Sequence, residues 1–479
     1  MNDIPQMNDM PQMSSYSNGT PPVLSNALSV IQGASVNSFL VSPTSGSTSV
    51  PANGQIRIQV PSNAIIDWRT SKLHFSVETA GTATRLPVGI KTLVERCSIL
   101  CGGTTIYQGN NFFNIQEYAS SVAENRPLDA SEHPEMCVFT DCQGGNATTG
   151  ESYSAGLSAN GGTVFSMDLG EFARTCSPRL WDLSLLPQIE IVFYLSPNSV
   201  LVAPKGQDLT GGTNPFTTAN TTITDQTFTI TNPVFVANCY SLADGMYSMA
   251  LAQKIADVGY LELVYNQSLA FNQQWNSSAR LSIGAMSLNK LTALFRLRTH
   301  GTRGGAVNIF GNPGNDTNEL PKLSYKGTGY VNKSGLVEYQ SKFQQLSCPV
   351  ADGGTNGVYD DTTTPPLFQW SVNSSSLPQF QANVAQFYEM TKWANNVDKM
   401  PVKHFSEYLF NKFTISYPLN LPEVPHQKKY ISGLDTRASN SYVELKGTNT
   451  NTTDYDCLIL AETTSILRVG RGKSTEVLN

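Results

Sequence analysis

Several stretches of this chain alternate strictly between apolar and polar residues. In "QIRIQVP", Ile56, Ile58 and Val60 fall on one face of an extended chain, and "KLHFSVET" at residues 72–79 repeats the pattern. A period of two predicts β-strands with one buried face, because successive side chains of a strand point to opposite sides. Strand-like segments recur at 188–195, 227–238, 260–265, 280–286, 293–298, 412–419, 442–447, 456–462 and 465–470. Predicted strands therefore fill both halves of the chain.

The composition agrees with an all-β fold. The chain has 37 Gly and 26 Pro among 479 residues, and only 14 % of its residues are charged. Exposed helix faces are usually populated by Glu, Lys and Arg, so such a turn-rich and weakly charged chain favours strands. Its length exceeds that of one ordinary domain and predicts two.

Three segments have the spacing of helices. The first is "NNFFNIQEYASSVAEN", and the second, "DGMYSMALAQKIADVG", begins at Asp244 as a predicted cap. The third, "SLPQFQANVAQFYEMTKWANNVDK", has Ser376 as a predicted cap, Pro378 in the first turn, and an apolar stripe that includes Phe380. We expect only these few short helices.

Polar, glycine- and threonine-rich segments separate the strands at 141–162, 202–225 and 299–321. Loops of this length are uncommon in compact domains and are usually functional or disordered. Residues 1–50 are rich in Ser, Asn, Pro and Gly and open with the near-duplicate "MNDIPQ" and "MNDMPQ". They cannot bury enough apolar surface to fold alone, so we expect either an extended arm that orders against a partner or a disordered terminus.

The charge distribution argues against direct genome contact. The net charge is −6, and the first basic residue is Arg57. Binding to nucleic acid requires Lys and Arg gathered against phosphates. No apolar run is long enough to span a membrane, and the first residues lack the order of a signal peptide, so we expect synthesis in the cytosol or nucleus and no secretion.

The eight cysteines allow two interpretations. Cys97 and Cys101, with Cys137 and Cys142, could form a four-thiolate zinc site. The favoured interpretation is reduced core thiols, because Cys97 lies in the apolar segment "VERCSILCGG" and buried Cys behaves as a small hydrophobe. We therefore predict no metal site.

No catalytic constellation is evident. His74 alternates with apolar neighbours in a strand pattern and should face solvent or a partner subunit; His133, His300, His404 and His426 show no ligand spacing. The terminal "GKST" has Leu467 where a phosphate-binding loop requires its first glycine, and no helix can follow it. We interpret it as the polar exit from a terminal strand, and predict no catalytic, cofactor-binding or metal-binding residue and no enzyme activity.

The order of several segments is similar to that of a known family. "VPSNAIIDWRTSKLHFSVET", "VERCSILCGGTTIYQGNNFFNIQEY", "LWDLSLLPQIEIVFYLSP" and "TFTITNPVFVANCYSLADGMYSMAL" resemble the first half of double jelly-roll major capsid proteins. "GYLELVYN", "SLNKLTALFRLR", the helix near 380–397 and "KKYISGLDTRASNSYVEL" resemble the second half. Capsid proteins of polinton-like viruses and adintoviruses look closest, followed by virophages and, more distantly, tectivirus capsids and adenovirus hexons.

This resemblance implies an all-β fold of two tandem eight-stranded jelly-roll β-sandwiches with a few short helices and long loops. The expected division is an arm at 1–50, a first jelly roll at 51–240, a connecting helix at 241–258 and a second jelly roll at 259–479. The implied function is a major capsid protein whose homotrimers form pseudo-hexameric capsomers of an icosahedral shell around double-stranded DNA. Its implied partners are itself, neighbouring capsomers, penton proteins and minor or cement proteins, without sequence-specific nucleic acid; an inner membrane is left open.

Two other classes remain as alternatives. A viral or cell-surface β-sandwich that binds a receptor or glycan would agree with the sequons at Asn146, Asn220, Asn276 and Asn373, although such triplets arise by chance in chains rich in Asn, Ser and Thr. A β-sandwich carbohydrate hydrolase would need two carboxylates at working distance, and the sequence names none.

Overall fold

The computed structural model describes fourteen segments of the chain, and everything below refers to them. They are residues 34–80, 86–87, 89–124, 164–201, 227–242, 246–298, 324–325, 342–350, 358–359, 364–402, 408–409, 412–420, 433–437 and 441–479. The three long loops predicted at 141–162, 202–225 and 299–321 lie outside them, as do residues 1–33 of the predicted arm.

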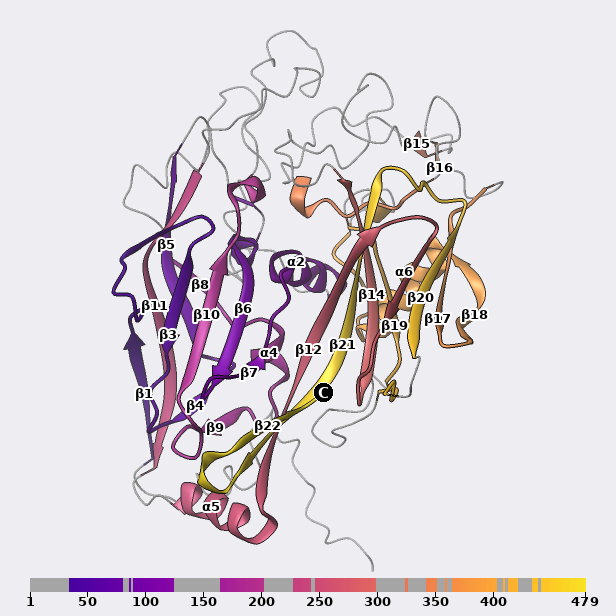
Figure 1. Ribbon diagram of the computed structural model, residues 1–479. Coiled ribbons are helices and arrows are strands. Elements are labelled where there is room, and N and C mark those ends of the chain that lie inside the picture. Colours follow the sequence, from indigo (N-terminus) through magenta and orange to yellow (C-terminus); the bar gives the residue numbers. More distant parts are fainter. Residues whose placement is uncertain are drawn as a thin grey trace, which may run out of the picture.

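The first half of the chain forms a sandwich of two antiparallel sheets (Figure 1). One sheet runs β8-β5-β11-β4-β9, and two more strands, β1 and β2, pair with β11. The other runs β3-β10-β6-β7. Their strands are β1 (Ala34–Val41), β2 (Ser49–Pro51), β3 (Gln55–Gln59), β4 (Ile65–Asp67), β5 (Lys72–Ala80), β6 (Val94–Cys101), β7 (Thr104–Tyr107), β8 (Val164–Met167), β9 (Leu180–Asp182), β10 (Ile189–Leu195) and β11 (Thr227–Leu242).

The second half repeats this plan. One sheet runs β12-β21-β14-β19, with β22 paired to β21, and the other runs β13-β20-β17-β18. A short parallel pair, β15 and β16, lies apart from them. The strands are β12 (Tyr260–Gln274), β13 (Ser278–Ser282), β14 (Leu288–Leu297), β15 (Ser324–Tyr325), β16 (Val358–Tyr359), β17 (Leu367–Val372), β18 (Ser375–Asn383), β19 (Thr414–Pro418), β20 (Tyr442–Thr448), β21 (Tyr455–Gly470) and β22 (Thr475–Leu478).

Helices are few and short among the described residues. They are the α-helices α2 (Phe113–Ala123), α4 (Glu171–Thr175), α5 (Met246–Val258) and α6 (Val384–Ala394), and the 3-10 turns η1 (Ile90–Leu93), η3 (Asn198–Val200), η5 (Lys342–Gln344) and η6 (Arg471–Lys473). The first two predicted helices are confirmed as α2 and α5. The predicted cap Asp244 lies outside the described residues.

The third predicted helix is wrong in its first half. Ser376, Pro378 and Phe380 belong to strand β18, and Phe380 is half exposed instead of lying on a buried helix stripe. The helix begins at Asn383, whose side chain accepts a 2.9 Å hydrogen bond from the backbone of Gln386 while the Gln386 side chain returns one to the backbone of Asn383. This reciprocal cap fixes the start of α6. A capping residue was present in both places, and pairing of β18 with β17 decided between them.

The strand predictions are confirmed, except that two predicted strands form one continuous strand. The segments predicted at 456–462 and 465–470 form a single 16-residue strand, β21, which pairs with β12 over 15 residues, from Tyr260 opposite Gly470 to Gln274 opposite Asp456. The "GKST" residues follow this strand as the turn η6 and the start of β22, as the interpretation of a polar strand exit requires.

Elements of each half reach into the core of the other. Leu263 and Leu467, from the lower parts of β12 and β21, are buried in the core of the first sandwich. Ile115 and Val122 of α2 are buried in the core of the second. In Figure 1, α2 lies between the two sandwiches and the β12–β21 pair runs from one toward the other. The two sandwiches are therefore joined through buried structure.

Candidate functional site

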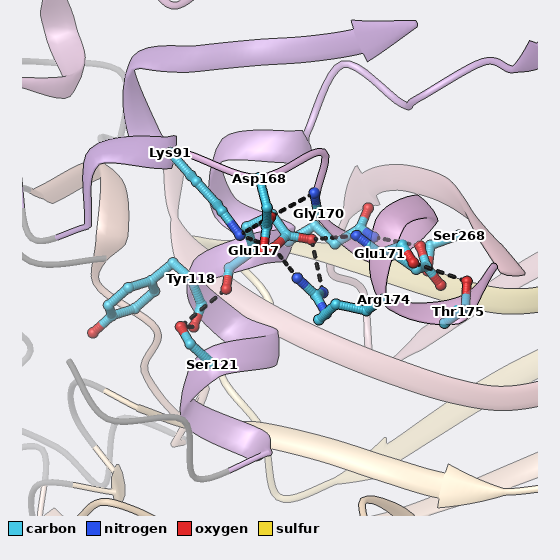
Figure 2. A network of polar contacts seen from close by, with 11 residues as sticks. Lys91, Glu117, Tyr118, Ser121, Asp168, Gly170, Glu171, Arg174, Thr175 and Ser268 are labelled. Atoms are coloured by element: carbon cyan, nitrogen blue, oxygen red, sulfur yellow. Dashed lines mark hydrogen bonds and ion pairs between the residues drawn. The ribbon is translucent and has the colours of Figure 1, made fainter. Parts of the chain in front are cut away.

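The junction between the sandwiches contains a buried network of charged and polar side chains (Figure 2). Glu117 on α2 is fully buried and lies at its centre. Its carboxylate accepts a hydrogen bond of 3.2 Å from Lys91 and a pair of 2.8 and 3.0 Å from Arg174. Lys91, only 2 % exposed, is also 2.5 Å from the carboxylate of Asp168. Two cations thus compensate two carboxylates within the first sandwich.

The backbone at Gly170 brings α4 against this network. Gly170 has φ of 66°, in the left-handed region, and its N–H donates to Asp168. A Cβ at this position would lie 2.8 Å from a carboxylate oxygen of Glu117. The next residue, Glu171, donates its backbone N–H to Glu117 at 3.2 Å. Glycine is required here because both the backbone conformation and the space exclude a side chain.

Glu171 continues the network into the second half of the chain. Its carboxyl oxygens accept from Gln116 at 2.8 Å and from Ser268 of β12 at 3.1 Å. Burial, followed by the charge of Glu462, raises the pKa of Glu171 to about 8. At neutral pH this carboxyl is therefore mostly protonated, which removes one negative charge from the junction.

A second charged cluster faces Glu171 from the second sandwich. Glu462 of β21 lies 2.9 Å from the ammonium of Lys290 and accepts a 2.8 Å hydrogen bond from Asn266. Lys290 also donates to Asn395 at the end of α6. Burial alone would lower the pKa of Lys290, but Glu462 and Glu124 outweigh it and raise that pKa. Glu462 thus stabilises the charged form of Lys290.

A cavity of about 270 Å³ lies between these clusters, with Glu171, Arg174, Lys290 and Glu462 in its wall. The charges around it are matched within the chain, which is the arrangement expected of a buried polar connection. In the described residues, no three His, Cys, Asp or Glu side chains are placed to hold a metal ion. These buried contacts therefore fix the position of the two sandwiches relative to each other.

None of these network residues was predicted from the sequence as a site residue. Glu117 and Glu171 have no periodic signature, because their partners come from sequence-distant elements. One signal was available: Lys91 interrupts the apolar run "VGIKTLV", and a lone buried cation requires a partner.

The residues that sequence analysis did discuss are not brought into one site. Cys97 and Cys101 are buried free thiols, and burial raises the pKa of Cys101 to about 11, which keeps it protonated and inert; Cys137 and Cys142 lie outside the described residues. His74 is half-buried on β5, opposite Val234, and burial with the nearby Lys72 lowers its pKa. The other four histidines lie outside the described residues, as do Asn146 and Asn220. Asn276 and Asn373 are exposed.

The outer surface of the first sandwich carries a second distinct feature, the exposed strand β1. It pairs with β11 over all eight of its residues, and it lies at the periphery of the molecule in Figure 1. Residues 35–40 are exposed on both faces of the strand, including Val36 at 64 % and Leu40 at 75 %. Within the described part of the chain, no helix is long and apolar enough to cross a membrane.

Comparison with known proteins identifies the fold. No family model matches the chain, and no curated protein matches its sequence. Its structure is similar to that of VP54 of PBCV-1, as fitted into a reconstruction of the virophage Sputnik, with a TM-score of 0.53 and 13 % identity over 93 % of this chain and 97 % of that one. It is also similar to the Faustovirus major capsid protein, with a TM-score of 0.52 and 9 % identity over 91 % of this chain and 90 % of that one.

These similarities extend over nearly the full length of both partners. The chain has the double jelly-roll fold, and the expected all-β class of two tandem jelly rolls is confirmed. At such low identities the likeness shows the fold alone.

Proposed function

We propose that this chain is the major capsid protein of a double-stranded DNA virus, in which homotrimers form pseudo-hexameric capsomers that tile an icosahedral shell. The observation that carries the proposal is the full-length double jelly-roll fold shared with viral capsid proteins. Two sandwiches per chain give a trimer six similar units, which can occupy the corners of a hexagon.

The junction supports this role. A capsomer built from paired sandwiches needs a fixed angle between them, and the network around Glu117 and Glu171 supplies buried, directional contacts across that boundary. Hydrogen bonds and ion pairs specify geometry more strongly than apolar contacts, because a small displacement leaves buried charges unpaired.

The proposal includes partners and location. The chain would contact itself, neighbouring capsomers, penton proteins and minor or cement proteins, in the virion, after synthesis in the host cytoplasm or nucleus and without secretion. A structural role without enzyme activity agrees with the charge-matched junction. The net charge of −6 disfavours a broad electrostatic grip on DNA.

Light scattering of the purified full-length protein tests the proposal. A particle of about 156 kDa, three times the chain mass of 52.0 kDa, with a hexagonal outline in negative-stain images is the expected result. A stable particle of one chain mass would contradict it and favour the alternative of a receptor-binding or glycan-binding β-sandwich.

A further inference from the structure

The edges of the sheets differ in how they are protected from pairing with other chains. An exposed edge strand offers unpaired backbone groups, and natural proteins usually block it with a charge or a proline. The described edge strands of five or more residues follow this rule except for β1. The blocking residues are Arg57 in β3, Glu262 in β12, Arg280 in β13, Pro378 in β18 and Pro418 in β19.

Strand β1 has the sequence ASVNSFLV, which contains neither a charged residue nor a proline. It pairs on one side with β11, and it is held there mainly by the backbone, with one side-chain hydrogen bond from Ser38 to Asn238. Val36, Phe39 and Leu40 are 64, 41 and 75 % exposed. An eight-residue uncharged edge without a blocking charge or proline is a template for strand addition.

We propose that β1 is an interface between copies of this chain, in which the β1 strands of two protomers pair antiparallel across a two-fold axis. Residues opposed across antiparallel strands lie on the same face, so the axis passes at one residue, and a register centred on Ser38 pairs residues 35–41. It places Val36 opposite Leu40 of the second copy, and Asn37 opposite Phe39. The seven-stranded sheet thereby continues from one protomer into the next.

A second copy suits this edge on electrostatic grounds. The strand is uncharged, so pairing with itself opposes no like charges, whereas the chain as a whole carries −6.

The contact is weak on its own, because one strand pair buries less area than a stable dimer needs. Repetition in a lattice makes such contacts sufficient. That lattice rests on the function proposed above: two-fold related β1 strands would join neighbouring capsomers. The pairing of two copies itself requires no shell.

Cross-linking of single-cysteine variants tests whether two β1 strands meet. Asn37→Cys would lie beside the two-fold axis, and a short bis-maleimide should link it into a covalent dimer of two chains. Gln379→Cys, exposed on the proline-protected edge β18, is the matched control, and the unsubstituted chain measures the background from its own cysteines. A yield for Asn37→Cys no greater than for Gln379→Cys overturns the proposal.

Charge pairs test the register. In Asn37→Lys/Phe39→Lys, lysines oppose each other twice across the axis, whereas in Asn37→Lys/Phe39→Glu each lysine faces a glutamate. We expect the first to weaken association in sedimentation by about fivefold or more relative to the second, from the usual cross-strand charge effects. Gln379→Lys/Gln381→Lys, with the same added charge on β18, should leave association unchanged. Equal weakening by the two β1 variants rules out this pairing.

The two proposals fail in different ways. If the protein forms trimers but β1 gives no cross-link, the capsid proposal is supported and the proposed β1 interface is contradicted. If β1 cross-links two chains but the protein forms no trimer, the β1 interface is supported and the proposed trimeric capsomer is contradicted.

Discussion

The junction between the jelly rolls and the strand β1 have opposite chemistry. The junction is buried and charged, with Lys91 and Glu117 exposed by no more than 2 %. Strand β1 is exposed and uncharged, with Leu40 exposed by 75 %. Folding normally places charge outside and apolar residues inside. Each region departs from that rule, and each departure indicates a contact that has to be specific.

The difference lies in where the partner comes from. At the junction every charge finds its partner within the chain, so the contact forms when the protein folds. At β1 the open edge finds none among the described residues, so its contact would form when copies meet. We therefore expect changes at the junction to act on stability and changes at β1 to act on association.

The largest effect is expected from Glu117→Gln. The substitution leaves Lys91 and Arg174 with one fewer charge to compensate them in a buried site, which should lower the free energy of unfolding by about 3–5 kcal/mol. Urea unfolding of the purified protein measures it. Glu190→Gln, which breaks a partly exposed pair with Arg57, is the control and should cost no more than about 1 kcal/mol. If both variants lose a similar free energy of unfolding, the junction network stabilises the fold no more than a surface ion pair does.

A smaller effect is expected from pH at Glu171. The unfolded chain has already released this proton by pH 7, since an ordinary glutamate has a pKa of 4.5, whereas the folded pKa is about 8. Its stabilising contribution is therefore fully present below the unfolded pKa, and is lost as pH rises through the folded one. Between pH 7 and pH 9 the protein should lose about 1 kcal/mol from this group.

The variant Glu171→Gln should remove this part of the pH dependence, because its amide stays neutral. Thermal unfolding at both pH values measures the difference between the two proteins. Glu476→Gln, exposed on β22, is the control and should keep the wild-type response. If Glu171→Gln and the wild type lose the same stability between pH 7 and pH 9, the carboxyl is ionised already at pH 7.

The sequence was informative where the signal was local and periodic. The alternation in β3 and β5 and the helical spacing of α2 are properties of neighbouring residues, and they predicted the all-β class and most elements. The β18–α6 boundary was missed because Ser376 and Asn383 are both acceptable caps, and only pairing with β17 decides between them.

The junction could not be predicted in the same way. Glu117 meets Arg174 across 57 residues, and Asn266 meets Glu462 across 196. Such partners are brought together by the chain topology, and a single sequence does not indicate which distant charged residues will pair. The open edge of β1 was hidden for a similar reason: its sequence placed it in the predicted arm at 1–50, and its exposure became visible once β11 was seen to pair with it on one side.

The smallest effect on stability is expected at β1 itself. Val36→Thr and Leu40→Thr replace exposed side chains without disturbing the shape of the strand, so each should change the free energy of unfolding by less than about 0.5 kcal/mol. Ile230→Thr, fully buried on the neighbouring β11, makes a comparable change in the core and should cost about 2 kcal/mol or more, because it buries an unpaired hydroxyl. Urea unfolding at a protein concentration too low for association between capsomers measures all three. A large loss at Leu40 would mean that this side chain packs within its own chain, and the contrast between a junction for folding and an edge for association would not hold.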